Sequence, residues 1–307
     1  PEYGRYFNPY GGGMYRGAML TKNELGIVCV FFGLFYLWTI LSRADISDLR
    51  RRREEMILST LFLAMIFYLL SFASSAAALV VFAMGTAIMV GFGMRLVSRR
   101  YFGTYVVGVI AIVAIVQLTF GIYGQLLEML GKDVTLTDRT DIWSDVIELQ
   151  TNPLIGMGFE SFWLGSRIAT MWEKWWWHPN QAHNGYIETY LNLGFVGLGL
   201  LFMIVVSAFR RISSELQTDF EFARFKMAIL FGTLAYNVTE AMFKGVALTW
   251  LMFHIVVLVR GPSEQKASVS KPVRAYAREA PGEPIRTAAE PTATKHGQTS
   301  YYRRRVQ

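Results

Sequence analysis

Long apolar stretches occupy the first 260 residues of the chain and constrain its fold more than any other feature. Seven of them can be marked, at residues 25–41, 56–72, 76–94, 101–123, 186–209, 222–238 and 241–259. Most approach the roughly 20 residues that a helix needs to cross a bilayer. The last two are weaker candidates, because Arg224 and Lys226 interrupt one and Lys244 interrupts the other. With 53% hydrophobic residues overall, the chain is predicted to be an all-α, polytopic helical membrane protein.

Basic residues are distributed unevenly between the loops that connect these stretches. If successive stretches cross in alternate directions, loops 42–55, 95–100 and 210–221 share a face with the C-terminal tail. Those loops hold Arg43, Arg50, Arg51, Arg52, Arg53, Arg95, Arg99, Arg100, Arg210 and Arg211. The opposite face is far longer, yet its basic residues are only Arg5, Arg16, Lys22, Lys132, Arg139, Arg167, Lys174 and Lys244. The positive-inside rule assigns the denser face to the cytoplasm. Topology therefore explains the net charge of +7, and nucleic acid is not an expected partner.

This orientation places residue 1 and the segment 124–185 outside the cytoplasm. Because nothing in the chain could carry Pro1 across a membrane, we expect residues 1–260 to be the C-terminal part of a longer membrane protein, with about seven spans. The segment 124–185 is then a large periplasmic loop with short amphipathic helices. Residues 261–307 are rich in Ala, Pro, Thr, Glu and Arg. That composition predicts a disordered cytoplasmic tail.

One of the short helices is predicted directly after Asp138. Apolar residues within 142–149 follow helical spacing, and an Asn-Pro pair then ends the pattern. Arg139 falls in the first turn, where the helix dipole and the unpaired N–H groups favour an anion. The alternatives for Arg139 are a surface charge or an ion pair with Asp138 or Asp141.

The sequence lacks the patterns of several reaction classes. His, Cys and carboxylates are not clustered at metal-ligand spacing, so no metal is expected. Without a Gly-rich nucleotide loop ending in Lys-Ser or Lys-Thr, no ATP and no other cofactor is expected. The outer face retains the cations Arg16, Lys22 and Arg139 and the histidine His183. This set suits the transfer of a sugar from a lipid diphosphate. Arginines can bind the diphosphate and stabilise its developing charge, and an imidazole can accept the proton of an attacking hydroxyl.

Two motifs of the outer face also carry a family resemblance. "TDRTDIWSDVIELQTNPLIGMGFESFW" followed by "AHNGYIETYLNLGFVGL" resembles the signature of the O-antigen ligase and polymerase family, and "RGAMLTKNELG" is similar to a stretch of exopolysaccharide polymerases in that group. The resemblance implies an inverting, metal-independent glycosyltransferase that takes glycans from undecaprenyl diphosphate on the periplasmic side of the bacterial inner membrane. It implies His183 as the catalytic histidine and Arg139 and Arg16 as diphosphate ligands. Asp138 departs from the family pattern, in which Gly usually precedes the arginine.

Supporting roles are open for three further residues. Glu188 lies one turn past His183 and could orient it, or it could be an ordinary glutamate at headgroup level. Glu240 lies between two predicted spans beside Asn237, and ionisable groups near membrane depth are functional candidates by default. Asn184 allows the chain to turn into the following helix. His183 itself could be an interfacial residue at a helix start, and the resemblance favours the catalytic interpretation.

The predicted function is the transfer or polymerisation of glycan from an undecaprenyl-diphosphate donor onto an acceptor hydroxyl, in O-antigen or exopolysaccharide assembly. The acceptor is left open between a second glycan, lipid A-core and a protein side chain. The alternative is a transporter or flippase for polysaccharide intermediates. Such proteins place charged groups at mid-bilayer on broken helices of repeated halves, and the sequence shows no such repeat. A structural membrane scaffold would leave the Arg-x-x-Ile-Trp and His-Asn-Gly motifs unexplained.

Overall fold

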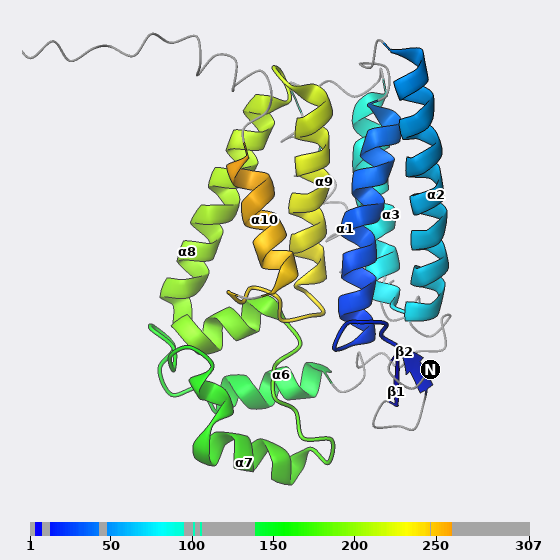
Figure 1. Cartoon of the computed structure of the whole chain (residues 1–307). Helices are drawn as coiled ribbons and strands as arrows, with labels where there is room; N and C mark the ends of the chain where they lie inside the picture. The colour runs from blue at the N-terminus through cyan, green and yellow to red at the C-terminus, as the bar shows by residue number, and fades with distance from the viewer. Residues whose placement is uncertain are drawn as a thin grey trace, which may run out of the picture. The chain divides into compact units, whose positions relative to one another are not determined.

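The computed structural model describes residues 4–7, 13–42, 48–94, 101, 105, 139–245 and 247–259. Two short strands and a series of helices follow one another in that part of the chain (Figure 1). Their bounds are β1 Arg5–Phe7, β2 Gly13–Tyr15, α1 Lys22–Leu41, α2 Leu49–Ala73, α3 Ala76–Gly93, α6 Arg139–Glu148, the 3₁₀ turn η4 Ser161–Trp163, α7 Gly165–Lys174, α8 Gly185–Glu215, α9 Phe220–Tyr236 and α10 Leu248–Leu258. Most of the predicted span 101–123, the basic loop 95–100 and the predicted tail 261–307 lie outside the described residues.

The predicted all-α, polytopic membrane fold is confirmed. Within the described residues, α1, α2, α3 and α8 are long and apolar enough to cross a membrane. The strands form only a small antiparallel hairpin, with Arg5 paired to Tyr15. The last two predicted spans differ from expectation, because α9 has 17 residues and α10 only 11. The helical part of the final stretch starts at Leu248 and not at 241, since residues 241–245 form an irregular loop.

Helices α1, α2 and α3 form one packed group, and α9 packs against α1 and α3. Helices α1, α2 and α3 are each capped at the N-terminus by a polar side chain that accepts hydrogen bonds from backbone N–H groups of the first turn. These capping residues are Thr21, Asp48 and Ser75. The shared core is apolar, as the side chains of Ile27 and Leu70 illustrate, each about 1% exposed. Each helix therefore begins at a polar cap and is held by apolar packing.

Helix α9 carries two buried cations, Arg224 and Lys226. Their charges made this stretch one of the two weaker candidates for a membrane span. Lys226 is fully buried and donates to the Glu215 carboxylate at 2.6 Å and to the Val259 carbonyl at 2.6 Å. Arg224 pairs with Glu221 one turn earlier in the same helix. Pairing of this kind lowers the cost of burying charge among apolar helices.

Side-chain contacts define two ends of this group of helices. At one end, Asn23 at the start of α1 bonds Glu240 after α9 and Ser75 before α3. At the other end, Ser42 after α1 bonds Glu221 at the start of α9. Consecutive helices thus run in opposite directions, as Figure 1 shows for α1, α2 and α3. We call the end that holds Glu240 the site end and the end that holds Glu221 the basic end.

Helix α8 is broken at Gly194, where φ is 61° and ψ is −155°. Its first part turns sharply against the rest (Figure 1). The portion after the break, 195–215, has about the 20 residues of a complete span. The predicted span 186–209 is therefore divided, and its first residues form a separate short helix that ends at the break.

The segment between α6 and α8 has a small core of its own. Ile142 and Val146 of α6, Phe162 of η4 and Met171 of α7 are buried together against the first part of α8. An ion pair between Lys174 and Asp145 (2.6 Å) links α7 to α6, and the hydrogen bond to the Asp145 carboxylate raises the pKa of Lys174. The predicted amphipathic helices of the outer loop are thus present as α6 and α7, and they pack as a unit.

Candidate functional site

The turn 237–240 after α9 is contacted by two separate parts of the chain, the start of α6 and the start of α8. Arg139, the first residue of α6, donates to the Thr239 carbonyl. Asn184 donates to the Val238 carbonyl at 3.2 Å, and the Gly185 N–H donates to the Asn237 carbonyl at 2.8 Å. The predicted anion-binding and histidine motifs therefore meet on one turn, in which the sequence had singled out Glu240 as a candidate.

Glu240 is the centre of this arrangement. Its carboxylate is buried and accepts from Asn23 Nδ2 at 2.6 Å and from Arg139 Nη2 at 3.3 Å, both at Oε1. The other oxygen, Oε2, lies 3.7 Å from Nδ1 of His183. One carboxylate thus bonds an arginine and lies beside a histidine that is distant from it in the sequence. We call Asn23, Arg139, His183 and Glu240 the site cluster.

Arg139 takes a different partner from those considered in the sequence. Its guanidinium reaches across to Thr239 and Glu240 and not to Asp141 of its own helix; Asp138 lies outside the described residues. A guanidinium presents five N–H groups in a fixed plane, so the two contacts orient that plane while further N–H groups can meet an oxyanion. With 20% of its side chain exposed, Arg139 can be reached from solvent.

His183 is held by its neighbours in an unusual backbone conformation. Its φ of 50° lies in the left-handed region, which costs a non-glycine residue roughly 1–3 kcal/mol and persists only where the surroundings impose it. Asn184 imposes it from one side by capping α8, since its Oδ1 accepts from the N–H groups of Tyr186 and Ile187. The imidazole is 25% exposed, and the amide nitrogen of Gln181 lies 3.5 Å from its Nδ1.

Gly185 explains why the histidine motif continues as Asn-Gly. A Cβ at this position would lie 2.1 Å from Oδ1 of Asn237, so only glycine allows the helix start to approach the turn. Asn237 is itself fixed, because its Oδ1 accepts from the N–H of Met242 and its Nδ2 donates to Thr233. Close backbone contact at Gly185 therefore holds His183 beside Glu240.

Glu188 has a role other than the predicted orientation of His183. Its two carboxylate oxygens accept from the indole of Trp163 at 2.8 Å and from the Ala182 N–H at 2.9 Å. The side chain is 2% exposed. Glu188 thus fastens η4 and the residue before His183 onto α8, while Glu240 is the carboxylate that faces the imidazole.

Arg16 and Lys22 lie near the start of α1, at the site end. Arg16 donates from Nη1 to the Leu20 carbonyl at 3.4 Å, and Lys22 is the first residue of α1. The next residue, Asn23, donates to Glu240 and is the member of the site cluster that sequence reasoning missed. Its position within "RGAMLTKNELG", one of the motifs that carry the resemblance, was the available signal.

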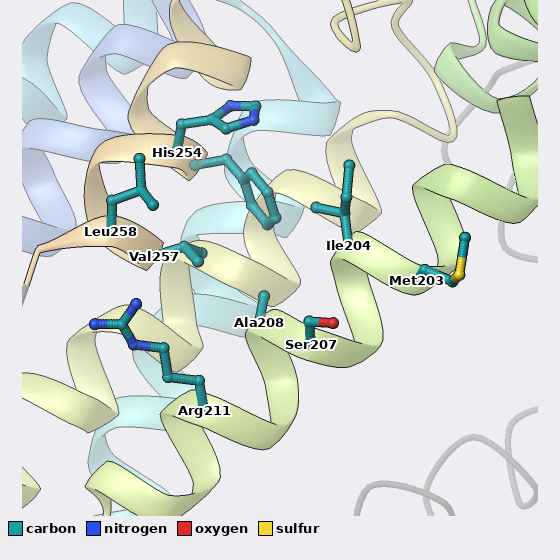
Figure 2. A pocket seen from close by; sticks show the side chains of 9 residues that line it. Met203, Ile204, Ser207, Ala208, Arg211, His254, Val257 and Leu258 are labelled. Carbon is teal, nitrogen blue, oxygen red and sulfur yellow. The ribbon is translucent and has the colours of Figure 1, made fainter.

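One hollow lies away from the site cluster. A pocket of about 390 Å³ separates α8 from α10 and is lined mainly by apolar side chains, with Arg211 at its edge (Figure 2). Arg211 pairs with Glu215 near the end of α8, which places the pocket towards the basic end. It belongs to the apolar surface between two helices and contains none of the predicted site residues.

Comparison with known proteins agrees with the motifs. Residues 57–202, which include Arg139 and His183, match the O-antigen ligase family. The chain is 34% identical over 134 residues to the exopolysaccharide production protein ExoQ of Rhizobium meliloti (strain 1021), and the aligned region covers 40% of this chain. It spans only 30% of the length of that relative. Over residues 57–202 the chain is therefore similar to the O-antigen ligase family, as its motifs predicted.

Proposed function

We propose that this multi-pass membrane protein transfers or polymerises glycan from an undecaprenyl-diphosphate donor onto an acceptor hydroxyl at the periplasmic face of the bacterial inner membrane. Its family and its relative support a role in O-antigen or exopolysaccharide assembly. The observation that carries the proposal is the meeting of Arg139, Glu240 and His183 on one turn at the site end. A cation for a leaving diphosphate and a base for an incoming hydroxyl then lie in one place.

Arg139 would bind the donor through its diphosphate. As the bond between the sugar and the diphosphate breaks, negative charge grows on the leaving oxygen, and a guanidinium can stabilise it through two parallel hydrogen bonds. The diphosphate leaves as a stabilised anion, so the step needs no strong general acid. Arg16 and Lys22 would assist from the start of α1, where the donor's second phosphate group could lie.

His183 would take the proton from the acceptor hydroxyl. Glu240 faces Nδ1 of the imidazole, and a carboxylate there favours the tautomer with a proton on Nδ1. The other ring nitrogen, Nε2, is then able to accept the hydroxyl proton as the acceptor oxygen attacks the sugar. The oxygen would attack opposite the leaving diphosphate, which inverts the configuration at the anomeric carbon. No step of this scheme calls for a metal or for ATP.

The distribution of charge supports a periplasmic position for the site. Arg50 and Arg51 begin α2, whose other end lies beside Asn23, so these arginines are at the basic end. By the positive-inside rule that end is cytoplasmic. In a variant without Cys29, a cysteine at Glu173 should react with an impermeant reagent in intact spheroplasts, and a cysteine at Arg51 should not. The opposite pattern would refute the orientation.

The direct test is a transfer assay with the purified full-length protein in lipid vesicles. A glycan on undecaprenyl diphosphate should be joined to an acceptor in the presence of EDTA and without ATP, releasing undecaprenyl diphosphate. Flipping of the donor across the bilayer with no new glycosidic bond would instead support a transporter. A strict need for a divalent cation would exclude the metal-independent scheme.

A further inference from the structure

The break in α8 is filled by a loop from elsewhere in the chain. Breaking a helix at Gly194 frees backbone groups, and four backbone groups close to the break are bonded by residues 153–158. The Phe195 and Val196 N–H groups donate to the carbonyls of Pro153 and Leu154 (2.9 and 3.1 Å), and the carbonyls of Leu191 and Asn192 accept from the N–H groups of Met157 and Gly158 (2.8 and 3.0 Å). Irregular backbone at membrane depth is tolerated only where such bonds are made.

Two glycines make this fit possible. A Cβ on Gly156 would lie 2.4 Å from the backbone of Asn192, and a Cβ on Gly194 would lie 2.4 Å from the backbone of Leu154. Both glycines also have positive φ, 73° and 61°. Loop and helix therefore touch backbone to backbone, and the loop has a fixed depth relative to the span 195–215.

The outer surface of this loop is apolar. Leu154, Ile155, Phe159 and Leu164 form what we call the loop patch, and their side chains are between 59% and 73% exposed. Within 153–164 the only ionisable residue is Glu160, and its carboxylate pairs with Lys244 at 2.9 Å. Large apolar side chains that extend from a surface with its charge paired indicate a nonpolar partner.

The loop patch continues the surface by which α8 faces lipid. Val196, whose N–H bonds Leu154, is itself exposed, as are Leu200 and Phe202 further along the span. The geometry points to the acyl chains of the membrane leaflet at the site end as the partner of the loop patch, so that the loop inserts beside α8. The insertion would hold the site cluster at the depth of the headgroups. This inference rests on α8 spanning the membrane and not on the transfer reaction.

Depth measurement tests the insertion. Single cysteines at Leu154 and at Phe159, in a Cys29→Ala, His183→Ala background, would carry an environment-sensitive fluorophore in the full-length protein. The protein would be reconstituted in phosphatidylethanolamine and phosphatidylglycerol vesicles. Leu200→Cys is the control within lipid, and Glu173→Cys on the exposed side of α7 is the control in water.

Labels at Leu154 and Phe159 should emit to the blue of the Glu173 label and be quenched by doxyl groups on lipid chains, as the Leu200 label is. Quenching by aqueous iodide at the level of the Glu173 label would overturn the inference. Protection from both quenchers would overturn it as well, because another protein segment would then cover the loop patch. The His183→Ala background makes the result independent of glycan transfer.

Discussion

Two clusters of paired charges lie at opposite ends of the same helices, and they differ in how completely they are closed. At the basic end, the side chains of Lys226 and Glu215 are 0% and 2% exposed, and the two residues are only 11 positions apart in the sequence. At the site end, Arg139 and His183 are 20% and 25% exposed. They are joined to Asn23 through Glu240, which is 217 residues from Asn23. The first cluster is buried, and the second is partly exposed.

The charged groups of the basic end also have more complete hydrogen bonding than those of the site end. The Lys226 ammonium is enclosed by a carboxylate, a carbonyl and the ring of Phe222, whose centroid is 4.9 Å away. At the site end, the shared carboxylate leaves the imidazole at 3.7 Å, longer than a hydrogen bond. Complete pairing suits a structural role, whereas the looser contact leaves the imidazole open to other partners. Mutations at the two ends should therefore separate activity from stability.

Replacement of His183 should give the largest loss of activity with little loss of stability. General-base help is worth about 10²–10⁴ in rate, so His183→Ala should lower glycan transfer by about that factor. His183→Gln should be equally inactive, because it retains hydrogen bonding without a group that titrates. The measurements are initial transfer rates and thermal unfolding in the same detergent. Near-normal transfer by the Gln variant would reduce His183 to an orienting role.

Lys226→Ala should show the reverse pattern. Removing one partner of a buried ion pair leaves the other charge buried without a partner, which costs about 3–5 kcal/mol of folding stability. The variant should therefore unfold at a lower temperature. Its transfer rate per folded molecule should stay close to that of the parent protein. The double change Lys226→Met with Glu215→Gln removes both charges and should recover much of the lost stability. If it does not, the pair contributes more than its charges.

Arg139 tests whether the site cluster recognises geometry or only charge. Loss of one donor to a developing oxyanion costs about 10²–10³ in rate, and Arg139→Ala should fall in that range. Arg139→Lys retains the charge but loses the planar fork, so it should lie between Ala and the parent. Transfer rates at saturating donor are the measurement. Full activity of the Lys variant would mean that charge alone suffices.

The sequence predicted the parts of this molecule that depend on local pattern. Apolar length predicted the spans that became α1, α2, α3 and α8, and the amphipathic spacing after Asp138 predicted α6. The break at Gly194 was not predicted. It depends on hydrogen bonds from the distant loop 153–158, and the hydropathy of α8 carries no information about that loop. The late start of α10 was missed as well, because Ala241, Met242 and Phe243 continue the apolar pattern up to Lys244.

Three of the four residues of the site cluster were named from the sequence, but their convergence was not predicted. Arg139 and His183 stood out through their motifs, and Glu240 through its place beside a span. Their convergence depends on which helix ends lie side by side, a tertiary property without a local signal. Asn23 is the clearest case, because an asparagine in the first turn of a helix is ordinary until its distant carboxylate partner is known.

Replacement of Asn23 should therefore give the smallest change in activity, and it is the most specific test of the difference between the site end and the basic end. It donates to Glu240 at 2.6 Å and is itself held by the Ser75 hydroxyl at 3.0 Å and by the Tyr236 hydroxyl, which bonds its carbonyl. A hydrogen bond to a charged group is worth about 1.5–3 kcal/mol, and part of that energy fixes the position of Glu240. Asn23→Ala should lower kcat by roughly tenfold.

Because Arg139 remains in place in Asn23→Ala, KM for the donor should change little. The matched control is Ser75→Ala. It removes the hydrogen bond from the Ser75 hydroxyl to Asn23, which does not touch Glu240 directly, so it should have a weaker effect on kcat. A merely structural role for Asn23 would lower the yield of folded protein and leave kcat per folded molecule unchanged. That result would place Asn23 with the buried pairs of the basic end, and it would confine the functional cluster to Arg139, Glu240 and His183.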